Sequence, residues 1–380
     1  MKNNNSYDEN MKLKDGQKAV VTEYGQNPME AVDKFIRLEK QVAPDPATLK
    51  DKDVIIAVRS SSVGWVDLIM ASGQYQHMAT LPYIPGLEYS GDIVWAGPEA
   101  LSAGFRVGDR VMPDGFKVGP RTSGDYREWG GFANWAVAPV EALRPVPEGF
   151  SYDQACNFIG SYETAYHGLI ARGNLKEGET VLILGASGST GLAAVHIAKL
   201  LGATVIAAGR NQEKLDIVKE QGADHIINTT HSSSMRDEVK SLTGGRGVDV
   251  VYDTVGGELS LDALRCVSFG ARYLIMGWAG TPDVAKGKGG RGAPNANLLP
   301  TNLIMMKGLD VLGCPTVIST VNNPAIRKPR LKWLLEKVSE GQLSPYVSHT
   351  WPLEDVQEAL RSKFRGEVIG GAALHLPIIT

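Results

Sequence analysis

A glycine-rich segment in the middle of the chain carries the sharpest chemical signal in the sequence. Residues 181–191 read VLILGASGSTG, so that three glycines follow one another at intervals of three. This spacing allows a tight turn, close approach of the backbone to a pyrophosphate, and close packing of the following helix, whose N-terminus attracts phosphate. The segment predicts a dinucleotide-binding turn; the simpler alternative is a purely structural turn. The expected contact residues are Gly185, Ser187, Gly188, Ser189, Thr190 and Gly191.

The end of the next apolar run indicates which dinucleotide is bound. Enzymes that use NAD usually place Asp or Glu about 20 residues after the glycines, where the carboxylate binds the ribose 2′-hydroxyl. This chain has Gly209, Arg210 and Asn211 at that point, with Lys214 one turn later. A guanidinium binds a 2′-phosphate through charge-assisted hydrogen bonds, whereas a carboxylate would repel it. We therefore predict NADPH; the alternative is that Arg210 and Lys214 simply begin a solvated helix.

The segments around these residues alternate between strand and helix. Val181–Leu184 is a continuous apolar run of the kind that is buried on both faces of a parallel sheet. Further strands are expected at 204–208, 225–227, 249–252 and 272–276, and helices at 192–201, 212–221 and 259–267. Alternating strands and helices with short links predict an α/β fold with a doubly wound parallel sheet.

The preceding part of the chain predicts a different kind of domain. Short β-like runs lie at 54–58, 91–96, 108–112 and 132–138, separated by Gly and Pro and without a sustained helical period. They predict a twisted, partly closed β-domain. A helix is expected at 330–340, an amphipathic segment at 353–362 and a closing strand at 372–376. We expect a disordered tail over 1–16 ahead of this β-domain.

Composition excludes several classes of function. A chain of 380 residues favours two domains, and a net charge of −3 without long blocks of one sign favours neither nucleic acid nor membrane as a partner. No apolar run approaches the roughly 20 residues that span a bilayer, and the polar start is unlike a secretory signal. Cys156, Cys266 and Cys314 are too far apart for a zinc site of the usual spacing and are odd in number. They predict small buried side chains in a reducing, cytoplasmic compartment.

Seven stretches together carry a resemblance to a known family. The sequence resembles the quinone oxidoreductase branch of the medium-chain dehydrogenases/reductases from about residue 19 onward. The resemblance implies a GroES-like β-domain over 17–158, to which the C-terminal segment 320–380 returns, and a Rossmann domain over 159–319. It also implies an active site in the cleft between them, and a homodimer. The stretches are YIPGLEYSGDIVWAG (83–97), GDRVM (108–112), GGFANWAV (130–137), YETAYHGL (162–169), VLILGASGSTGLAAVHIAKLLGA (181–203), VVYDTVGG (250–257) and SHTWPLEDVQEAL (348–360).

The same resemblance bears on metal binding. Zinc-dependent members hold their catalytic metal with a Cys, a His and a later Cys or Asp. The corresponding positions here are Gly64, Leu87 and the neighbourhood of Ser161, and residues 113–130 contain no Cys for a structural zinc. None of these side chains suits zinc, so we predict a site without metal.

Without a Lewis acid, the substrate must already be electrophilic. Quinones and α,β-unsaturated carbonyl compounds meet this condition, and the protein then mainly aligns the nicotinamide with the acceptor. The resemblance places Tyr75 in the substrate pocket, and Tyr162 and Thr164 near the nicotinamide; either tyrosine could instead be a packing residue. The remaining candidate cofactor contacts follow strand ends in the same region, and they are Asn228, Gly256 and Gly277.

Two alternative functions remain open, and the sequence departs from the family pattern at two further places. The substrate could be an enoyl thioester of coenzyme A, or the protein could be a catalytically idle relative with a binding or structural role. The Gly-Lys pair often found before the final strand of relatives is Gly370-Gly371 here, so one possible phosphate-binding cation is absent. An insertion at 281–297 carries Lys286, Lys288 and Arg291, and it could be a solvated loop or a lid that meets phosphates.

Overall fold

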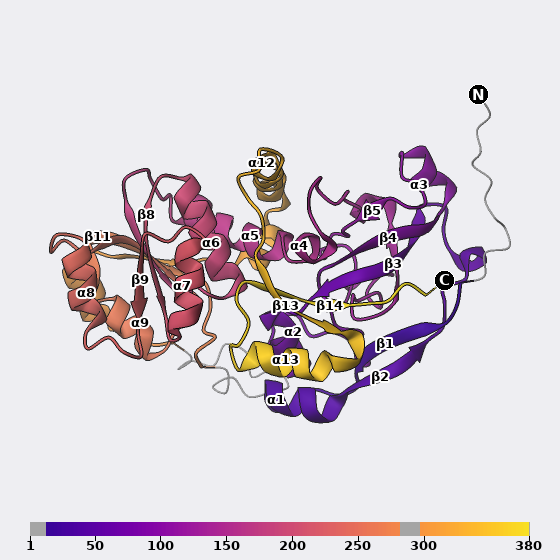
Figure 1. Ribbon diagram of the computed structural model, residues 1–380, viewed down its shortest axis with the longest axis horizontal. Coiled ribbons are helices and arrows are strands. Elements are labelled where there is room, and N and C mark those ends of the chain that lie inside the picture. The colour runs from indigo at the N-terminus through magenta and orange to yellow at the C-terminus, as the bar shows by residue number, and fades with distance from the viewer. Residues whose placement is uncertain (1–12, 282–296, 380) are drawn as a thin grey trace.

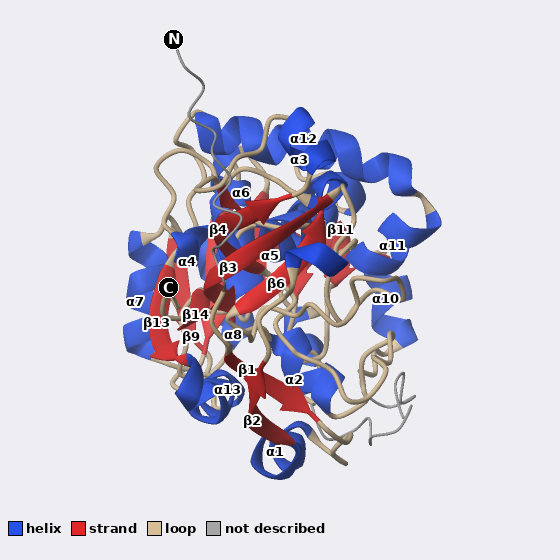
Figure 2. Cartoon of the chain, turned by 90° about the vertical axis from the view of Figure 1, so that its right-hand side faces the viewer, coloured by secondary structure: helices blue, strands red, loops and turns tan. Residues whose placement is uncertain are grey.

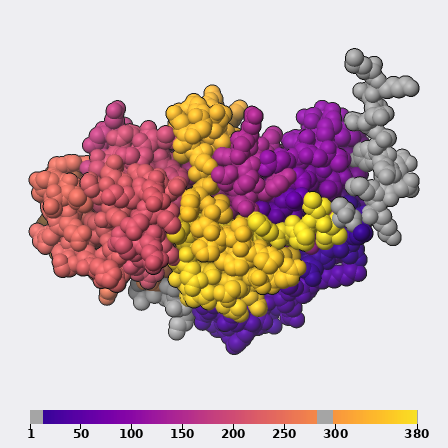
Figure 3. All heavy atoms as spheres, in the orientation of Figure 1, coloured from indigo at the N-terminus to yellow at the C-terminus, as the bar shows by residue number. Residues whose placement is uncertain are grey.

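Two sheets organise the chain into two domains that lie side by side (Figure 1). The computed structural model describes residues 13–281 and 297–379. The second domain holds a six-stranded sheet in the order β12-β11-β10-β7-β8-β9, and the first holds a sheet in the order β13-β14-β3-β4-β5, with β6 also paired to β3. The C-terminal segment, yellow in Figure 3, occupies the surface between the two. The predicted α/β fold with two kinds of domain is confirmed.

The first domain is a twisted antiparallel assembly around one long strand. Its central strand, Asp53–Ser62, has the sequence DVIIAVRSSS and contributes Val54, Ile56 and Val58 to the buried core. A separate two-stranded ribbon lies beside α1 and α2 (Figure 2). The strands are β1 (Gly16–Val21), β2 (Ile36–Gln41), β3 (Asp53–Ser62), β4 (Tyr89–Ala96), β5 (Arg110–Val111), β6 (Trp135–Pro139), β13 (Val347–Pro352) and β14 (Gly371–His375). The helices are α1 (Pro28–Glu30), α2 (Trp65–Ala71), α3 (Pro98–Ser102), α4 (Tyr152–Cys156) and α13 (Val356–Phe364).

The C-terminal strand closes the sheet of the first domain. β14 pairs antiparallel with β3 and parallel with β13, so the last strand of the chain lies inside the sheet that the first residues build. This is the return that the family resemblance implied. The sequence pattern missed the short α2, because seven residues are too few to show a helical period.

The second domain has the doubly wound order. Read from its β9 edge, the sheet runs β9-β8-β7-β10-β11-β12 with every pair parallel, which is the strand order of dinucleotide-binding folds. Its strands are β7 (Thr180–Leu184), β8 (Thr204–Gly209), β9 (His225–Asn228), β10 (Val248–Asp253), β11 (Val267–Ile275) and β12 (Asp310–Gly313). Its helices are α6 (Ser189–Leu200), α7 (Gln212–Glu220), α8 (Met235–Leu242), α9 (Glu258–Ala263), α10 (Thr301–Lys307) and α11 (Thr316–Asn322).

One predicted helix ends too late. The expectation of a helix over 259–267 is wrong at its C-terminal end, because α9 stops at Ala263 and Val267 begins β11. The apolar residues of that stretch serve a buried strand, and a short apolar run does not distinguish the two structures. The other predicted strands and helices of this domain coincide with observed elements to within a few residues.

Two further helices connect the domains. α5 (Ile159–Tyr166), extended by a π-helical turn over His167–Arg172, leads from the first domain into β7. α12 (Arg327–Ser339) contributes Leu334 and Val338 to the cluster that contains Val181 of β7. α12 therefore packs with the second domain, although residues 320–380 were predicted to belong to the first.

The three cysteines have the predicted surroundings. Cys156, Cys266 and Cys314 are all buried and unpaired. Burial raises the pKa of the Cys266 thiol to about 12 and that of Cys314 to about 11. Both thiols are therefore protonated at neutral pH and act as small apolar side chains, as the sequence indicated.

Candidate active site

The glycine-rich turn joins β7 to α6, and two of its glycines are required by the protein itself. Gly185 has a φ of +71°, and a Cβ there would lie 2.5 Å from Thr254 Oγ1. A Cβ on Gly191 would lie 2.2 Å from the carbonyl oxygen of Gly185. These contacts leave no room for a side chain, so Gly185 permits the turn and Gly191 permits α6 to approach the strand.

Gly188 differs from its two neighbours. It is the N-cap of α6 with a φ of −75°, which any residue adopts, and a Cβ there would have only the carbonyl oxygen of Gly185 nearby, at 3.4 Å. Nothing in the described chain therefore requires glycine at this position. The residue is exposed, and it stands before the first N–H groups of α6, which lack intrahelical acceptors. An unobstructed backbone facing a helix N-terminus fits the pyrophosphate of a dinucleotide.

The three hydroxyl residues of the turn play different parts. Ser187 accepts the N–H of Gly370 with its carbonyl oxygen at 2.8 Å, and Ser189 donates its hydroxyl to the Gly370 carbonyl at 2.7 Å. Thr190 is half-buried in the first turn of α6. The C-terminal segment of the first domain therefore touches the predicted phosphate turn directly.

Two cations lie together beyond the end of β8. Asn211 caps α7 by accepting the Lys214 N–H at 3.0 Å, which sets Lys214 at the start of that helix. Lys214 donates to the carbonyl of Gly366, and a Cβ on Gly366 would lie 3.9 Å from Arg210 Nη2. Burial lowers the pKa of Lys214; the negative charge of Glu367 opposes this shift, and the positive charge of Arg210 adds to it. Arg210 and Lys214 together place positive charge at the end of the strand, where a ribose 2′-phosphate is expected.

The remaining predicted contacts of this strand edge are backbone positions and structural side chains. The carbonyl oxygen of Gly209 accepts the N–H of Thr229 at 2.8 Å. The Asn228 side chain donates to Gln212 and accepts from the N–H of Thr230, so it holds the end of β9. The role of Asn228 as a cofactor contact stays a prediction.

The end of β10 is organised by a residue that sequence reasoning missed. Asp253 is buried and accepts from the N–H of Gly256 at 2.9 Å and from the Tyr273 hydroxyl at 2.7 Å. Gly256 has a φ of +75°, and its Cβ would lie 3.1 Å from Trp278 Cα. A Cβ on Gly277 would have only the Thr254 carbonyl nearby, at 3.4 Å. Gly256 is thus needed by the turn, whereas Gly277 leaves open space beside the strand end.

The two predicted catalytic tyrosines are placed differently. Tyr162 is buried on α5, where its hydroxyl lies 2.7 Å from His196 Nδ1 and donates to the Ser344 carbonyl at 3.1 Å. Burial raises the pKa of this phenol far above its usual value. These contacts hold Tyr162 between α6 and the segment that contains Ser344, and its role near the nicotinamide stays a prediction. Tyr75 is buried in the core of the first domain, and Thr164 is half-buried on α5.

Two carboxylates, Asp67 and Glu88, lie beside the positions at which zinc-dependent members of the family have their metal ligands. Asp67 accepts the N–H of Gly64 at 2.9 Å and that of Gly86 at 3.0 Å, and Glu88 accepts the N–H of Gly160 at 2.6 Å. Burial raises the pKa of Asp67 to about 6 and that of Glu88 to about 7. Gly64, Leu87 and Ser161 offer no metal-binding side chain, and the described residues contain no group of three His, Cys, Asp or Glu side chains arranged for a metal ion.

A buried ionic network fixes α5 between the domains. Glu163 accepts from Arg327 Nε at 3.1 Å and from Arg330 Nε at 2.8 Å, and Arg327 also donates to Asp114 at 2.6 Å. Arg327 lies over the Phe116 ring, 4.1 Å from its centre. The network joins α5, α12 and the 114–116 loop of the first domain. No sequence signal identified it, because its members are far apart along the chain.

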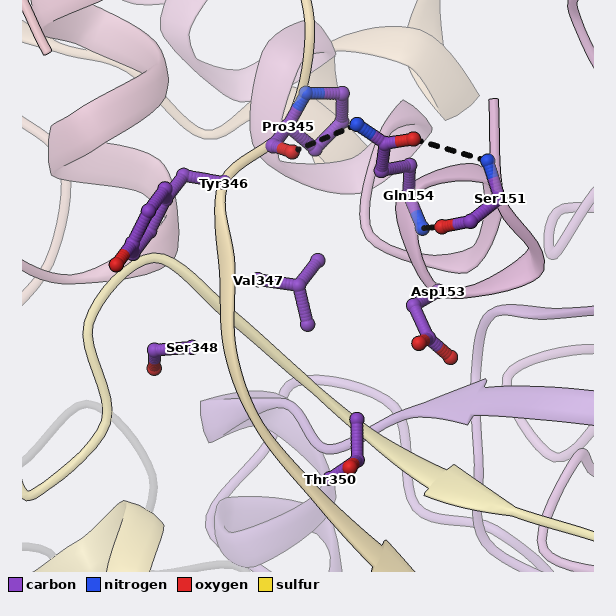
Figure 4. A pocket seen from close by; sticks show the side chains of 8 residues that line it. All are labelled: Ser151, Asp153, Gln154, Pro345, Tyr346, Val347, Ser348 and Thr350. Atoms are coloured by element: carbon purple, nitrogen blue, oxygen red, sulfur yellow. Dashed lines mark hydrogen bonds between the residues drawn. The ribbon is translucent and has the colours of Figure 1, made fainter. Parts of the chain in front are cut away.

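One hollow of the described surface lies away from the glycine turn. It is found between α4 and β13, where Gln154 donates to the Pro345 carbonyl and accepts the Ser151 N–H (Figure 4). No residue of the glycine turn lines it, so we do not assign it to the nicotinamide site. Lys286, Lys288 and Arg291 of the insertion and most of the predicted N-terminal tail lie outside the described residues.

Comparisons with known proteins agree with this geometry. Residues 50–148 match the family described as alcohol dehydrogenase GroES-like domain, and residues 189–328 match the family described as zinc-binding dehydrogenase. A quinone oxidoreductase-like protein 2 homolog from Nematostella vectensis is 32% identical over 84% of this chain and 82% of its own length. The chain belongs to the quinone oxidoreductase branch of the medium-chain dehydrogenases/reductases. It is therefore an oxidoreductase with a nicotinamide cofactor.

Other members of the family support the same placement. The quinone oxidoreductase of Homo sapiens is 30% identical over 93% of this chain and 99% of its own. The crystal structure of a probable oxidoreductase from Mycobacterium abscessus superposes with a TM-score of 0.75 at 25% identity and covers 96% of this chain and all of its own. Among the helices described here, none has the length and apolar composition needed to cross a membrane.

Proposed function

We propose that this protein uses NADPH to reduce a quinone or an α,β-unsaturated carbonyl compound by direct hydride transfer without a metal ion. The choice of reaction rests on Gly64, Leu87 and Ser161, which replace the ligands of the family's catalytic zinc. The choice of cofactor rests on Arg210 and Lys214, which stand where an enzyme specific for NAD has an acid.

The residues of the chain have defined tasks in this reaction. The turn at Gly185–Gly191 binds the pyrophosphate, and Arg210 with Lys214 binds the 2′-phosphate. When bound, the reduced nicotinamide supplies a hydride to an electron-poor carbon of the acceptor. Quinones and enones accept it without a Lewis acid because the resulting anion is delocalised. A proton then comes from water or from a hydroxyl, for which Tyr75 is our candidate.

A substrate panel tests the proposal. Quinones, enones, enals and enoyl esters of coenzyme A are each incubated with NADPH and with NADH, and nicotinamide oxidation is followed with product analysis. We expect turnover of a neutral quinone or enone with NADPH. Turnover of the enoyl thioesters alone would favour the second enzymatic reading, and no oxidation with any acceptor would contradict the proposed reaction.

Metal analysis tests the metal-free mechanism separately. We expect no stoichiometric zinc in the purified protein and no loss of rate when a chelator is added, because none of the three positions carries a zinc-binding side chain. About one zinc per chain, removed together with the activity, would contradict the mechanism.

We also propose that the protein is a homodimer. The support is an exposed edge of the second domain: β12 pairs only with β11 among the described residues, and large apolar side chains are exposed on nearby helices. Met305 is 73% exposed, Met306 59% and Val321 66%. Such patches are typical of protein interfaces. Met305→Glu together with Met306→Glu should shift the sedimentation of the protein toward a monomer, and an unchanged dimer or a wild-type monomer would contradict this interface.

We further propose a cytoplasmic location, which the unpaired cysteines support.

A further inference from the structure

A lysine of the first domain reaches the phosphate turn of the second. Lys363 lies on α13, and its ammonium donates to Ser189 Oγ at 2.9 Å, at the first residue of α6. The same Ser189 hydroxyl donates to the Gly370 carbonyl, so Lys363 and the 366–371 turn approach the α6 N-terminus together. Residues 174 positions apart therefore meet at the place where the backbone is open for a pyrophosphate.

This ammonium lacks a paired anion. Lys363 makes no ion pair with any residue in the described part of the chain. The closest negative influence is Asp67, whose two oxygens already accept the N–H groups of Gly64 and Gly86. Lys214 adds repulsion from the other side. A partly buried cation that faces a helix N-terminus and another lysine, without a carboxylate partner, is arranged for an anionic ligand.

The packing of α13 holds the lysine in this position. The neighbouring Phe364 ring stacks on Trp65 of α2, with 6.0 Å between ring centres and 5° between planes. A Cβ at position 371 would lie 2.6 Å from Asn157 Cγ. The Asn157 side chain is itself fixed by hydrogen bonds to Ser62 and Ala372. A side chain therefore cannot enter from position 371, whereas Lys363 approaches from α13.

We propose that Lys363 is a cofactor-binding residue that contacts the pyrophosphate from the first domain, opposite the backbone groups of the glycine turn. The proposal rests on the proposed function in that it takes the ligand to be a nicotinamide dinucleotide. It adds a residue from the other domain to that site, so that binding of the diphosphate joins α13 to α6.

Binding measurements with three ligands test this assignment without relying on activity. ADP-ribose carries the pyrophosphate but neither the nicotinamide nor the 2′-phosphate. NADH adds the nicotinamide, and NADPH adds both the nicotinamide and the 2′-phosphate. We expect Lys363→Met to weaken all three by the same factor, about ten- to a hundredfold, as the loss of a charge-assisted contact predicts. Lys363→Arg should stay within severalfold of wild type. Lys219→Met removes an exposed charge on α7 and should change nothing; thermal unfolding of each variant verifies that it is folded.

The pH dependence supplies an independent readout. Burial lowers the pKa of Lys363 to about 8; Asp67 on α2 opposes this shift, and Lys214 on α7 adds to it. Binding of the diphosphate requires the protonated ammonium, so the affinity of wild-type protein for ADP-ribose should fall above pH 8 by up to tenfold per pH unit. Lys363→Arg should abolish this decline, because a guanidinium stays charged.

Each result decides between defined outcomes. Wild-type affinities in folded Lys363→Met would overturn the role of Lys363 and leave the proposed function intact. Loss of NADPH affinity alone would assign the lysine to the 2′-phosphate and overturn its contact with the pyrophosphate. If the wild-type protein binds ADP-ribose but does not prefer NADPH, the proposed cofactor is contradicted, and the role of Lys363 can still be tested with ADP-ribose. If the wild-type protein binds none of the three ligands, both proposals are overturned.

Discussion

The two domains present polar groups by different means. In the second domain, the β7–α6 turn presents backbone N–H groups and glycines, and its shape is set by contacts of 2.2–2.5 Å that a Cβ would make; we call it the backbone face. In the first domain, charge is carried by the side chains of Asp67, Glu88 and Lys363, whose pKa values burial moves to about 6, 7 and 8; we call them the side-chain face. The backbone face should therefore be insensitive to pH and intolerant of added atoms, whereas the side-chain face should tolerate substitution and respond to pH near neutrality.

The largest effect should come from adding atoms to the backbone face. Gly191→Ala places a Cβ 2.2 Å from the Gly185 carbonyl oxygen, a backbone atom that cannot move aside easily, and should lower the free energy of unfolding by about 3 kcal/mol or more, at the upper end of the cost of overpacking. Gly188→Ala meets only one atom at 3.4 Å and should leave stability unchanged while weakening dinucleotide binding about tenfold or more. Urea unfolding and binding isotherms measured on both variants would separate these effects. Equal destabilisation by the two would show that Gly188 is also a structural glycine.

Removing a charge beyond β8 should have a selective effect. Arg210→Ala loses a charge-assisted contact worth roughly 1.5–3 kcal/mol, so NADPH should bind about ten- to a hundredfold more weakly while NADH is nearly unchanged. Dissociation constants for both cofactors measure this directly. Equal weakening of both, or a wild-type preference for NADH, would remove the basis for the cofactor assignment.

The smallest effect should appear on the side-chain face as a dependence of stability on pH. Because the pKa of Glu88 is about 7 in the folded protein and near its usual value of 4.5 in the unfolded chain, the unfolded chain releases its proton first. Stability should therefore fall as pH rises from about 4.5 to about 7, and stay lower above it. Glu88→Gln keeps an acceptor for the Gly160 N–H and should raise the free energy of unfolding at pH 8 by about 1–3 kcal/mol, with little change at pH 4.5. Urea unfolding at the two pH values measures the difference, and identical gains at both would contradict the raised pKa.

Sequence analysis predicted correctly the features that depend on residues adjacent in the chain. Val181–Leu184 is wholly buried, and the turn after it is built from adjacent residues, so periodicity and glycine spacing sufficed. It failed where a role depends on residues far apart. The partners of the Tyr162 hydroxyl, His196 and Ser344, could not be predicted because they lie 34 and 182 positions away in the sequence. Lys363 sits in an amphipathic stretch where a lysine suggests a solvated face, and only the fold brings it to Ser189.

The position of β14 has a consequence for how the protein is made. This strand, Gly371–His375, lies between β13 and β3, so a sheet begun by residue 53 is completed only after residues 371–375 have left the ribosome. Throughout synthesis the long β3 must wait with part of its edge unpaired, while the local strand–helix units of the second domain can already assemble. The nascent chain is then exposed to aggregation along β3, and a chain terminated before residue 370 would lack both β14 and the Gly370 contacts to the phosphate turn.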